Sequence, residues 1–119
     1  MRKFRNIKVE YEGIQFDSKI ECQRYMVLKK AAREGKITML RLQDKFVLIK
    51  AQRDANGKYV YPCTYKADFS YYKGDKLVVE DVKGREATKT PEYRIKSKLM
   101  LERYGITIHE VTKDNINEV

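Results

Sequence analysis

The sequence predicts an α/β protein in which two helices are separated by a meander of strands. One helical pattern ends at Gly35, and a second begins at Pro91 and ends at Gly105. Between the helices, two alternating runs flank Gly74-Asp75, a dipeptide that tolerates the positive φ of a two-residue hairpin turn. The expected order is therefore strand, helix, several strands, helix and strand.

Length and charge narrow the classes to which the protein can belong. Its 119 residues suit one domain, residues 1–119, with a real core. The 26 basic and 17 acidic side chains give a formal net charge of +9, which favours a polyanionic partner, nucleic acid above all. No apolar stretch approaches the roughly 18 residues of a membrane span, and the N-terminus lacks a signal-peptide pattern, so we expect no membrane contact and a cytoplasmic location. The isolated Cys22 and Cys63 are expected to be free thiols.

The first predicted helix follows a short strand and turn at residues 7–16. Ser18 and Glu21 form a capping-box pattern before the run IECQRYMVLKKAAREGK. Glu21 also falls on the apolar arc of this helix, where a carboxylate needs a partner. Two partners are open on spacing alone: Arg24, three residues later, or a metal ion shared with other carboxylates.

Two segments between the helices have strand patterns. Residues 37–51, ITMLRLQDKFVLIKA, indicate one or two strands with a kink near Gln43. Asn56-Gly57 favours a type I′ hairpin turn that returns through residues 58–61. Both segments lead into a central hairpin.

Residues 65–84, YKADFSYYKGDKLVVEDVKG, form this hairpin and carry the candidate site. Its two-residue turn sets a register in which Asp68 lies directly opposite Asp81. Opposed side chains have Cβ atoms about 4.5–5.5 Å apart, so two carboxylates there repel unless a cation lies between them. A divalent metal ion would satisfy both.

Two lysines are expected on the same face of the hairpin. Lys66 lies opposite Lys83 in this register, and Lys83 shares a face with Asp81 because strand side chains alternate. An Asp-X-Lys triplet with a second Asp on the preceding strand is typical of metal-dependent phosphodiester hydrolysis, in which the metal polarises the phosphate and activates water. The alternative interpretation is a surface salt-bridge ladder worth up to roughly 1 kcal/mol per pair.

The second predicted helix spans residues 91–104 and includes Lys96 at a position where burial is expected. Lys96 is either a lysine at the edge of the core whose ammonium reaches water, or a second cation aimed at a phosphate. A last strand follows at residues 106–111. The tail, residues 112–119, is expected to be frayed.

Four blocks of the sequence, FDSKIECQRY, YKADFSYY, VVEDVKG and TPEYRIKSKLM, resemble the PD-(D/E)XK nuclease superfamily. They are similar to the matching blocks of small phage-encoded nucleases related to Holliday junction resolvases. The resemblance implies a restriction-endonuclease-like core, that is, a mixed central β-sheet flanked by helices. It also implies that Glu21, Asp68 and Asp81 bind Mg²⁺, for which Mn²⁺ substitutes. Lys83 would be the catalytic lysine, and Lys96 matches a basic position in the second helix block.

The sequence departs from the superfamily pattern at one place, since Ala67 stands where the superfamily name expects proline. Glu80 is a second carboxylate beside Asp81. Alternation favours Asp81 as the ligand because it shares a face with Lys83.

The function implied by the resemblance is that of a Mg²⁺-dependent endodeoxyribonuclease, with branched DNA as the favoured substrate. It would act in phage recombination or replication, in the host cytoplasm. Two symmetric cuts at a four-way junction require two copies of the single candidate site, so a homodimer is expected. The alternatives are a non-catalytic nucleic-acid-binding module and a restriction-type or repair nuclease without branch preference.

Overall fold

The computed structural model describes residues 8–84 and 89–119. Arg2, Lys3 and Arg5, which contribute to the basic charge of the sequence, lie outside the described residues. The elements follow the predicted order of strand, helix, strands, helix and strand. In chain order they are β1 (Val9–Tyr11), β2 (Ile14–Phe16), α1 (Lys19–Arg33), β3 (Thr38–Ile49), β4 (Gln52–Arg53), β5 (Tyr59–Val60), β6 (Cys63–Lys73), β7 (Lys76–Val82), α2 (Pro91–Tyr104) and β8 (His109–Val111).

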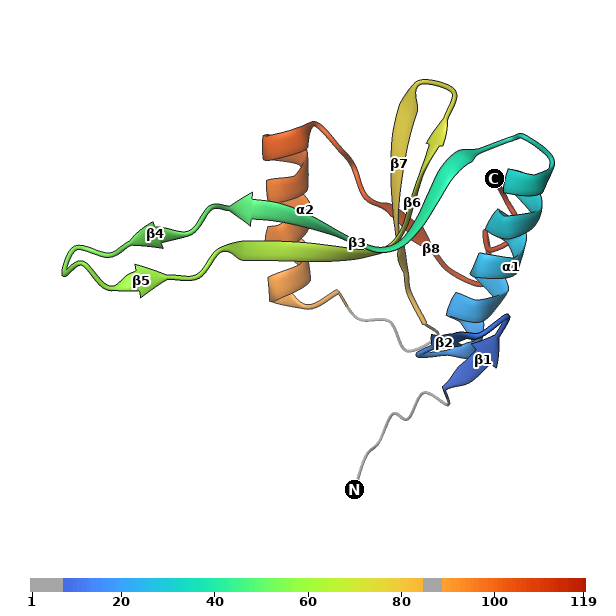
Figure 1. Ribbon diagram of the computed structural model, residues 1–119, viewed down its shortest axis with the longest axis horizontal. Helices are drawn as coiled ribbons and strands as arrows, with labels where there is room; N and C mark the ends of the chain where they lie inside the picture. The colour runs from blue at the N-terminus through green and yellow to red at the C-terminus, as the bar shows by residue number, and fades with distance from the viewer. Residues whose placement is uncertain (1–7, 85–88) are drawn as a thin grey trace.

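The centre of the protein is a four-stranded sheet with the strand order β3-β6-β7-β8. The pairs β3–β6 and β6–β7 are antiparallel, whereas β8 runs parallel to β7. Helices α1 and α2 stand on opposite sides of this sheet (Figure 1). The predicted α/β architecture, a mixed sheet flanked by helices, is therefore confirmed and is compatible with a restriction-endonuclease-like core.

Both helices begin where the sequence predicts. The backbone N–H of Glu21 donates to Ser18 Oγ at 3.2 Å, which caps α1. Thr90 caps α2 in the same way, with a 3.0 Å hydrogen bond from the N–H of Tyr93. Gly105 ends α2 with a φ of +69°, a conformation that costs glycine little. The Ser18 cap fixes Glu21 in the first turn of α1.

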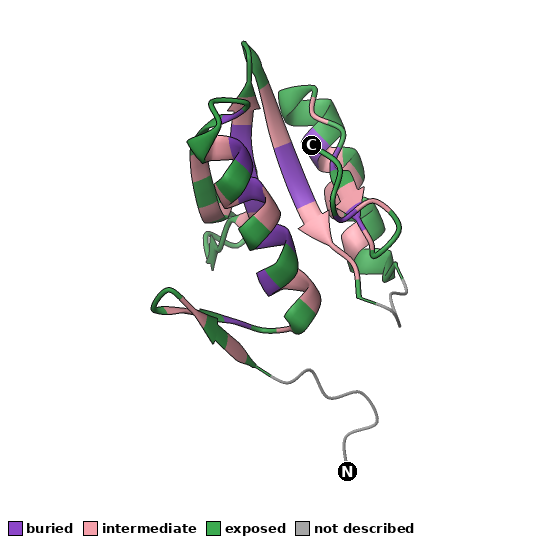
Figure 2. Ribbon diagram, turned by 90° about the vertical axis from the view of Figure 1, so that its right-hand side faces the viewer, coloured by how far each residue is buried: buried purple, intermediate pink, exposed green. Residues whose placement is uncertain are grey.

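Two apolar clusters fill the spaces between the sheet and the helices. The buried residues of the α1 cluster are Phe16, Cys22, Tyr25, Leu28, Ala31, Ile37, Phe69 and Tyr71. Those of the α2 cluster are Leu48, Tyr65, Ala67, Val79, Met100 and Ile108. Figure 2 shows buried residues on strands and helices alike. Burial of these side chains, each worth about 1.5–3 kcal/mol for a large aliphatic or aromatic group, holds the helices against the sheet.

Strand β6 turns over at Asp68. Tyr65 and Ala67 belong to the α2 cluster, whereas Phe69 and Tyr71 belong to the α1 cluster. Strict alternation would place these four odd-numbered residues on one face of the sheet. The strand therefore changes the face that its side chains occupy, and Asp68 lies at the change.

The neighbouring strand β3 is irregular at the same level. Gln43 has a positive φ of +56°, and the ladder pairs on either side of it place it opposite Asp68. This conformation confirms the kink expected near Gln43. The prediction that Lys66 shares a face with Asp68 is wrong, because the alternation of side chains is interrupted between these two residues of β6. Lys66 is exposed and pairs with Lys45 of β3.

Strands β4 and β5 form an arm that projects beyond α2 (Figure 1). The hairpin was predicted, but its turn is not type I′. Of Asn56 and Gly57, only Gly57 has a positive φ, +84°, whereas type I′ requires it at both. The carboxylate of Asp54 explains the difference, since it accepts hydrogen bonds from the N–H groups of Asn56 (2.8 Å) and Lys58 (2.9 Å) and organises the turn itself.

A buried ion pair joins α1 to β7. The Arg24 guanidinium donates to both carboxylate oxygens of Glu80, at 2.8 Å and 2.5 Å, and Tyr71 donates its hydroxyl to the same carboxylate. Both charged side chains are fully buried. The partner of Arg24 is thus Glu80, and the alternative in which Arg24 neutralises Glu21 is wrong.

The same arginine holds the C-terminal tail in place. Arg24 Nη1 donates to the carbonyl oxygens of Ile116 (2.8 Å) and Glu118 (2.6 Å). The side chain of Ile116 is buried as well. The expectation that residues 112–119 are frayed is therefore wrong, because a buried guanidinium needs acceptors for all its donors and the tail supplies them.

Within the described part of the chain, neither helix is long and apolar enough to cross a membrane. Cys22 and Cys63 are free thiols, as predicted.

Candidate functional site

Three carboxylates from three elements meet at one end of the central hairpin. Asp68 comes from the point where β6 turns over, Asp81 from near the end of β7, and Glu21 from the first turn of α1. The β6–β7 ladder runs in the predicted register as far as its last pair, Phe69 with Glu80, and Asp68 and Asp81 are the next residues on each strand. The charge of Glu21 raises the pKa of Asp68, and the charge of Asp81 raises those of both other carboxyls.

Asp68 is held by the backbone of the opposite strand. Its Oδ2 accepts the N–H of Val82 at 2.7 Å. Burial raises the pKa of Asp68 to about 8 even though the Val82 hydrogen bond favours the ionised form, and the charges of Glu21 and Asp81 add to the rise. The hydrogen bond from Val82 therefore does not outweigh the combined effect of burial and of the neighbouring negative charges on Asp68.

Within the described residues, Lys83 is the cation paired with a carboxylate of this group, that of Asp81. Its Nζ lies 2.9 Å from Asp81 Oδ2, and the exposed fractions of the two side chains are 15% and 18%. The ammonium also lies 3.2 Å from the centre of the Tyr93 ring, a cation–π contact with α2. The N–H of Lys83 donates to the carbonyl of Val111 at 2.7 Å, which fixes its backbone against β8. Three contacts, to Asp81, Tyr93 and Val111, therefore hold Lys83 in place.

Glu21 completes the group from α1. Burial raises its pKa, and the charges of Asp17 and Asp81 raise it further. Arg24, which could have neutralised Glu21, is bound to Glu80. The Glu80 carboxylate accepts hydrogen bonds from Arg24 and Tyr71. Glu80 is therefore part of the buried ion pair, whereas its neighbour Asp81 belongs to the carboxylate group.

Sequence reasoning missed Glu110 and Tyr93. Glu110 lies beside Asp81 in the parallel β7–β8 ladder. It accepts the hydroxyl of Tyr93 at 2.8 Å and pairs with Lys89 at 3.0 Å. Burial alone would raise the pKa of Glu110, but these hydrogen bonds and the charges of Lys89 and Lys83 lower it. Only the pairing of β8 with β7 places Glu110 here, and no local pattern indicates that pairing.

Tyr65 was missed too. Among the residues that the structure describes, its hydroxyl is the buried side-chain polar atom without a hydrogen-bond partner. Burial raises the pKa of Tyr65, and the charges of Asp81 and Asp68 and the nearby Tyr93 raise it further, so the hydroxyl is neutral and close to the carboxylates. A buried hydroxyl without a partner is costly, by about 1–3 kcal/mol, and its position suits a donor to a bound ligand or water.

Lys96 is not among the residues that the structure brings together at this site. Its Nζ pairs with Glu92 Oε2 at 2.9 Å, one turn earlier on α2. The side chain is 25% exposed. This geometry agrees with a lysine at the edge of the core whose charge reaches solvent, the first of the two interpretations of the sequence.

The donor set of the three carboxylates suits Mg²⁺, which prefers hard oxygen ligands. Within residues 8–84 and 89–119, however, no three Asp, Glu, His or Cys side chains form a ready-made metal site. Two of the three carboxylates are engaged by the protein itself: Asp68 accepts the Val82 amide, and Asp81 accepts a hydrogen bond from Lys83. The residues present fit a divalent cation in chemistry and in charge, since three carboxylates face one lysine.

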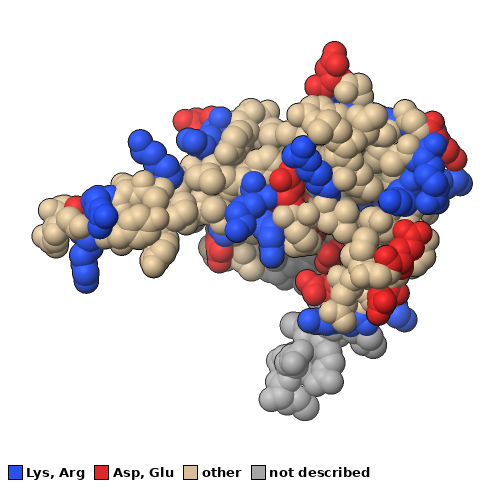
Figure 3. Space-filling view, viewed as in Figure 1, with Lys and Arg blue, Asp and Glu red and all other residues tan. Residues whose placement is uncertain are grey.

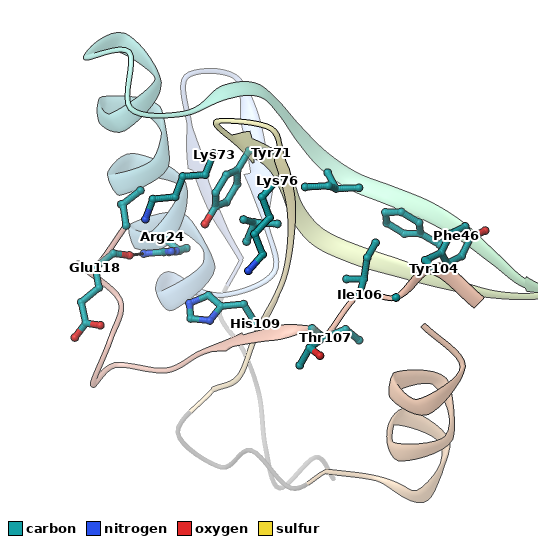
Figure 4. A pocket seen from close by; sticks show the side chains of 15 residues that line it. Arg24, Phe46, Tyr71, Lys73, Lys76, Tyr104, Ile106, Thr107, His109 and Glu118 are labelled. Carbon is teal, nitrogen blue, oxygen red and sulfur yellow. Dashed lines mark hydrogen bonds between the residues drawn. The ribbon is translucent and has the colours of Figure 1, made fainter. Parts of the chain in front are cut away.

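A cavity of about 1110 Å³ lies elsewhere (Figure 4). Its lining includes the polar side chains of Lys73, Lys76 and His109 and the buried side chains of Arg24 and Tyr71. None of the three carboxylates of the candidate site lines it. We place the candidate site at the three carboxylates because their charges affect one another there, whereas the Arg24 and Tyr71 side chains in this cavity are bound to Glu80.

The similarity of this chain to known proteins lies at the level of a family. Neither a curated protein nor a solved structure matches it. The family described as Protein of unknown function (DUF1064) matches residues 1–115, nearly the whole sequence. The chain therefore belongs to the DUF1064 family.

Proposed function

We propose that the protein is a metal-dependent endonuclease that hydrolyses phosphodiester bonds of branched DNA. The observation that carries the proposal is the meeting of Glu21, Asp68 and Asp81 with one positioned lysine, in a chain whose net charge is +9. A basic protein attracts a polyanion, and a local group of carboxylates inside it suits a cation that acts on that polyanion.

Glu21, Asp68 and Asp81 would hold the metal, with Mg²⁺ as the expected ion and Mn²⁺ as a substitute. When bound, the ion supplies Lewis-acid polarisation of a phosphate and a lowered pKa of water. The chain itself keeps the carboxylates in place: the Val82 amide orients Asp68, and the Ser18 cap places Glu21.

Lys83 is the catalytic residue of the proposal. Its ammonium lies beside Asp81 and over the Tyr93 ring, where it can bind a phosphate oxygen and stabilise the negative charge that develops on it. Glu110 holds Tyr93 through the phenol hydroxyl and so positions the ring under Lys83. The Tyr65 hydroxyl, which lacks a protein partner in the described structure, supplies a further donor toward the reacting group.

The preference for branched DNA rests on the resemblance of the four sequence blocks to nucleases related to junction resolvases. A second candidate function is a non-catalytic nucleic-acid-binding module. It is favoured by the lack of a ready-made metal site in the part of the chain that the structure describes. The two functions differ in whether Mg²⁺ produces a cut product.

The test compares cleavage of a four-way junction, a linear duplex and a single strand, with Mg²⁺ and with excess chelator. The parent should cut the junction only with the metal, and Asp81→Asn should abolish cutting while keeping DNA binding, because binding comes from dispersed phosphate contacts. Asp75→Asn is the matched control: the same substitution at an exposed carboxylate in the turn of the same hairpin. It should cut like the parent.

The outcomes separate the candidates. Undiminished cutting in chelator would remove the metal from the proposal. Salt-sensitive binding that ignores Mg²⁺, with no product from any of the three DNAs, would favour the binding module. Equal cutting of junction and linear duplex would leave a nuclease without branch preference.

A further inference from the structure

The β4–β5 arm consists of exposed residues. Every residue from 52 to 62 is exposed, so the arm adds nothing to either apolar cluster. Its side chains are nevertheless not those of a simple solvated loop. Tyr61 is 80% exposed, Tyr59 49% and Val60 39%. Large apolar groups gathered on a projecting element indicate a surface that contacts a partner.

One face of the arm joins two aromatic rings to a guanidinium. Tyr59 pairs with Arg53 across the two strands, and the Arg53 Cζ lies 5.5 Å from the centre of the Tyr59 ring. The rings of Tyr59 and Tyr61 meet edge to face, with centres 4.9 Å apart. Val60 alternates to the opposite face. We call Arg53, Tyr59 and Tyr61 the aromatic face of the arm.

The charge of the arm indicates the chemistry of the partner. Lys50, Arg53 and Lys58 are basic, whereas the carboxylate of Asp54 is engaged with two backbone amides of the turn. Figure 3 shows Lys and Arg side chains distributed along the arm. A surface that combines cations with open aromatic rings fits a polyanion that itself carries flat rings, namely a nucleic acid strand with unstacked bases.

We propose that the aromatic face of the arm binds unpaired nucleotides of a DNA strand, with a base stacked on Tyr61 and phosphates held by Arg53 and Lys58. The inference deepens the proposed function by naming the part of the DNA that is recognised away from the cut. β6 leads from the arm to Asp68, which follows Tyr61 by seven residues. At about 3.3 Å per residue, the aromatic face and Asp68 lie at most roughly 23 Å apart along the strand.

The experiment measures binding in chelator, so that no cleavage is needed. Fluorescence anisotropy is recorded with a labelled mixed-sequence single strand, a blunt duplex of that sequence and a four-way junction. Tyr59→Ala combined with Tyr61→Ala should weaken single-strand binding about tenfold or more, since each stacked base contributes about 1–3 kcal/mol. Duplex binding should change less than about twofold, because paired bases are not available to the rings.

Three further variants complete the design. Val60→Ala removes an exposed apolar side chain from the opposite face of the same arm and should bind all three DNAs like the parent. Tyr61→Phe keeps the ring and should bind the single strand nearly as well as the parent. Arg53→Ala should lower the salt slope of single-strand binding by about one, as expected for one lost phosphate contact. The urea midpoint of each variant should match that of the parent, because the arm has no buried side chain to lose.

Single-strand affinity unchanged in the double alanine variant would overturn the inference, as would an equal loss in Val60→Ala. A loss of dimer mass in light scattering without a loss of single-strand binding would assign the arm to a second copy of the chain instead. Failure of this inference and failure of the proposed nuclease function give different results. The first is a matter of single-strand binding in chelator, and the second of product formation with Mg²⁺. An arm that binds single strands in a protein that never cuts would leave this inference standing alone.

Discussion

At the residue scale, the two candidate lysines, Lys83 and Lys96, have different surroundings in the structure. Lys83 is largely buried between Asp81 and the Tyr93 ring. Lys96 pairs with Glu92, whose side chain is 75% exposed. An ion pair open to water contributes little, at most about 1 kcal/mol, whereas an ammonium partly removed from water is strongly felt by neighbouring charge. The two lysines should therefore differ in their effect on activity.

We predict that Lys83→Ala lowers kcat for junction cleavage by about 10²–10³, the usual cost of removing one group that stabilises developing charge. Lys96→Ala should reduce kcat by less than about tenfold, because its ammonium is bound to Glu92 on the same helix. Single-turnover cleavage with saturating protein measures both. A greater loss with Lys96→Ala than with Lys83→Ala would contradict our assignment and restore Lys96 to the reacting group.

At the element scale, the Arg24–Glu80 pair connects α1, β7 and the C-terminal tail. Two buried charges are stable there because each finds several partners: Arg24 reaches one carboxylate and two carbonyls, and Glu80 also accepts the Tyr71 hydroxyl. Such a pair is costly to break, since one unpaired charge would remain in the core. It holds α1 in the orientation that brings Glu21 toward β7.

We predict that Arg24→Ala lowers the free energy of unfolding by about 3–5 kcal/mol, the range for a broken buried ion pair. Glu34→Gln, which breaks the exposed Lys36–Glu34 pair near the end of the same helix, should change it by less than about 1 kcal/mol. Urea denaturation in chelator measures both. A small loss for Arg24→Ala would mean that water reaches this pair and that the tail is held by other contacts.

At the scale of the whole molecule, one chain offers one candidate site, whereas paired cuts across a four-way junction require two. A two-fold arrangement of identical chains would supply them. The net charge of +9 opposes association in the absence of DNA through repulsion between copies, and the negative backbone of the junction would relieve it.

We predict a homodimer on the junction, with two cuts related by symmetry. Light scattering at working concentration gives the mass with and without the junction, in chelator so that the DNA stays intact. The mass of the complex should contain two chains per junction. A complex with one chain per junction that still makes paired cuts after Mg²⁺ is added would contradict the prediction.

Local patterns of the sequence determined the elements of this protein and the register of its central hairpin. Ser18 and Gly105 mark helix ends because capping is a contact between near neighbours in the chain. Gly74 sets the register because a two-residue turn leaves one way to pair the strands. That register, counted outward, is what placed Asp68 near Asp81 before any tertiary contact was known.

Contacts between distant segments decided the rest. Arg24 had Glu21 within reach along its own helix, but it binds Glu80, 56 residues away, because only the packed core gives its guanidinium a full set of acceptors. Glu110 reached the site through the parallel pairing of β8 with β7, which a sequence pattern does not encode. Strand alternation could not foresee that β6 changes face at Asp68, where side chains on either side of it pack into two different clusters. An exposed charged group can be solvated by water, whereas a buried one needs a partner from the protein. The partner of a buried charge therefore depends on which groups the folded core brings next to it, and not on spacing along the chain.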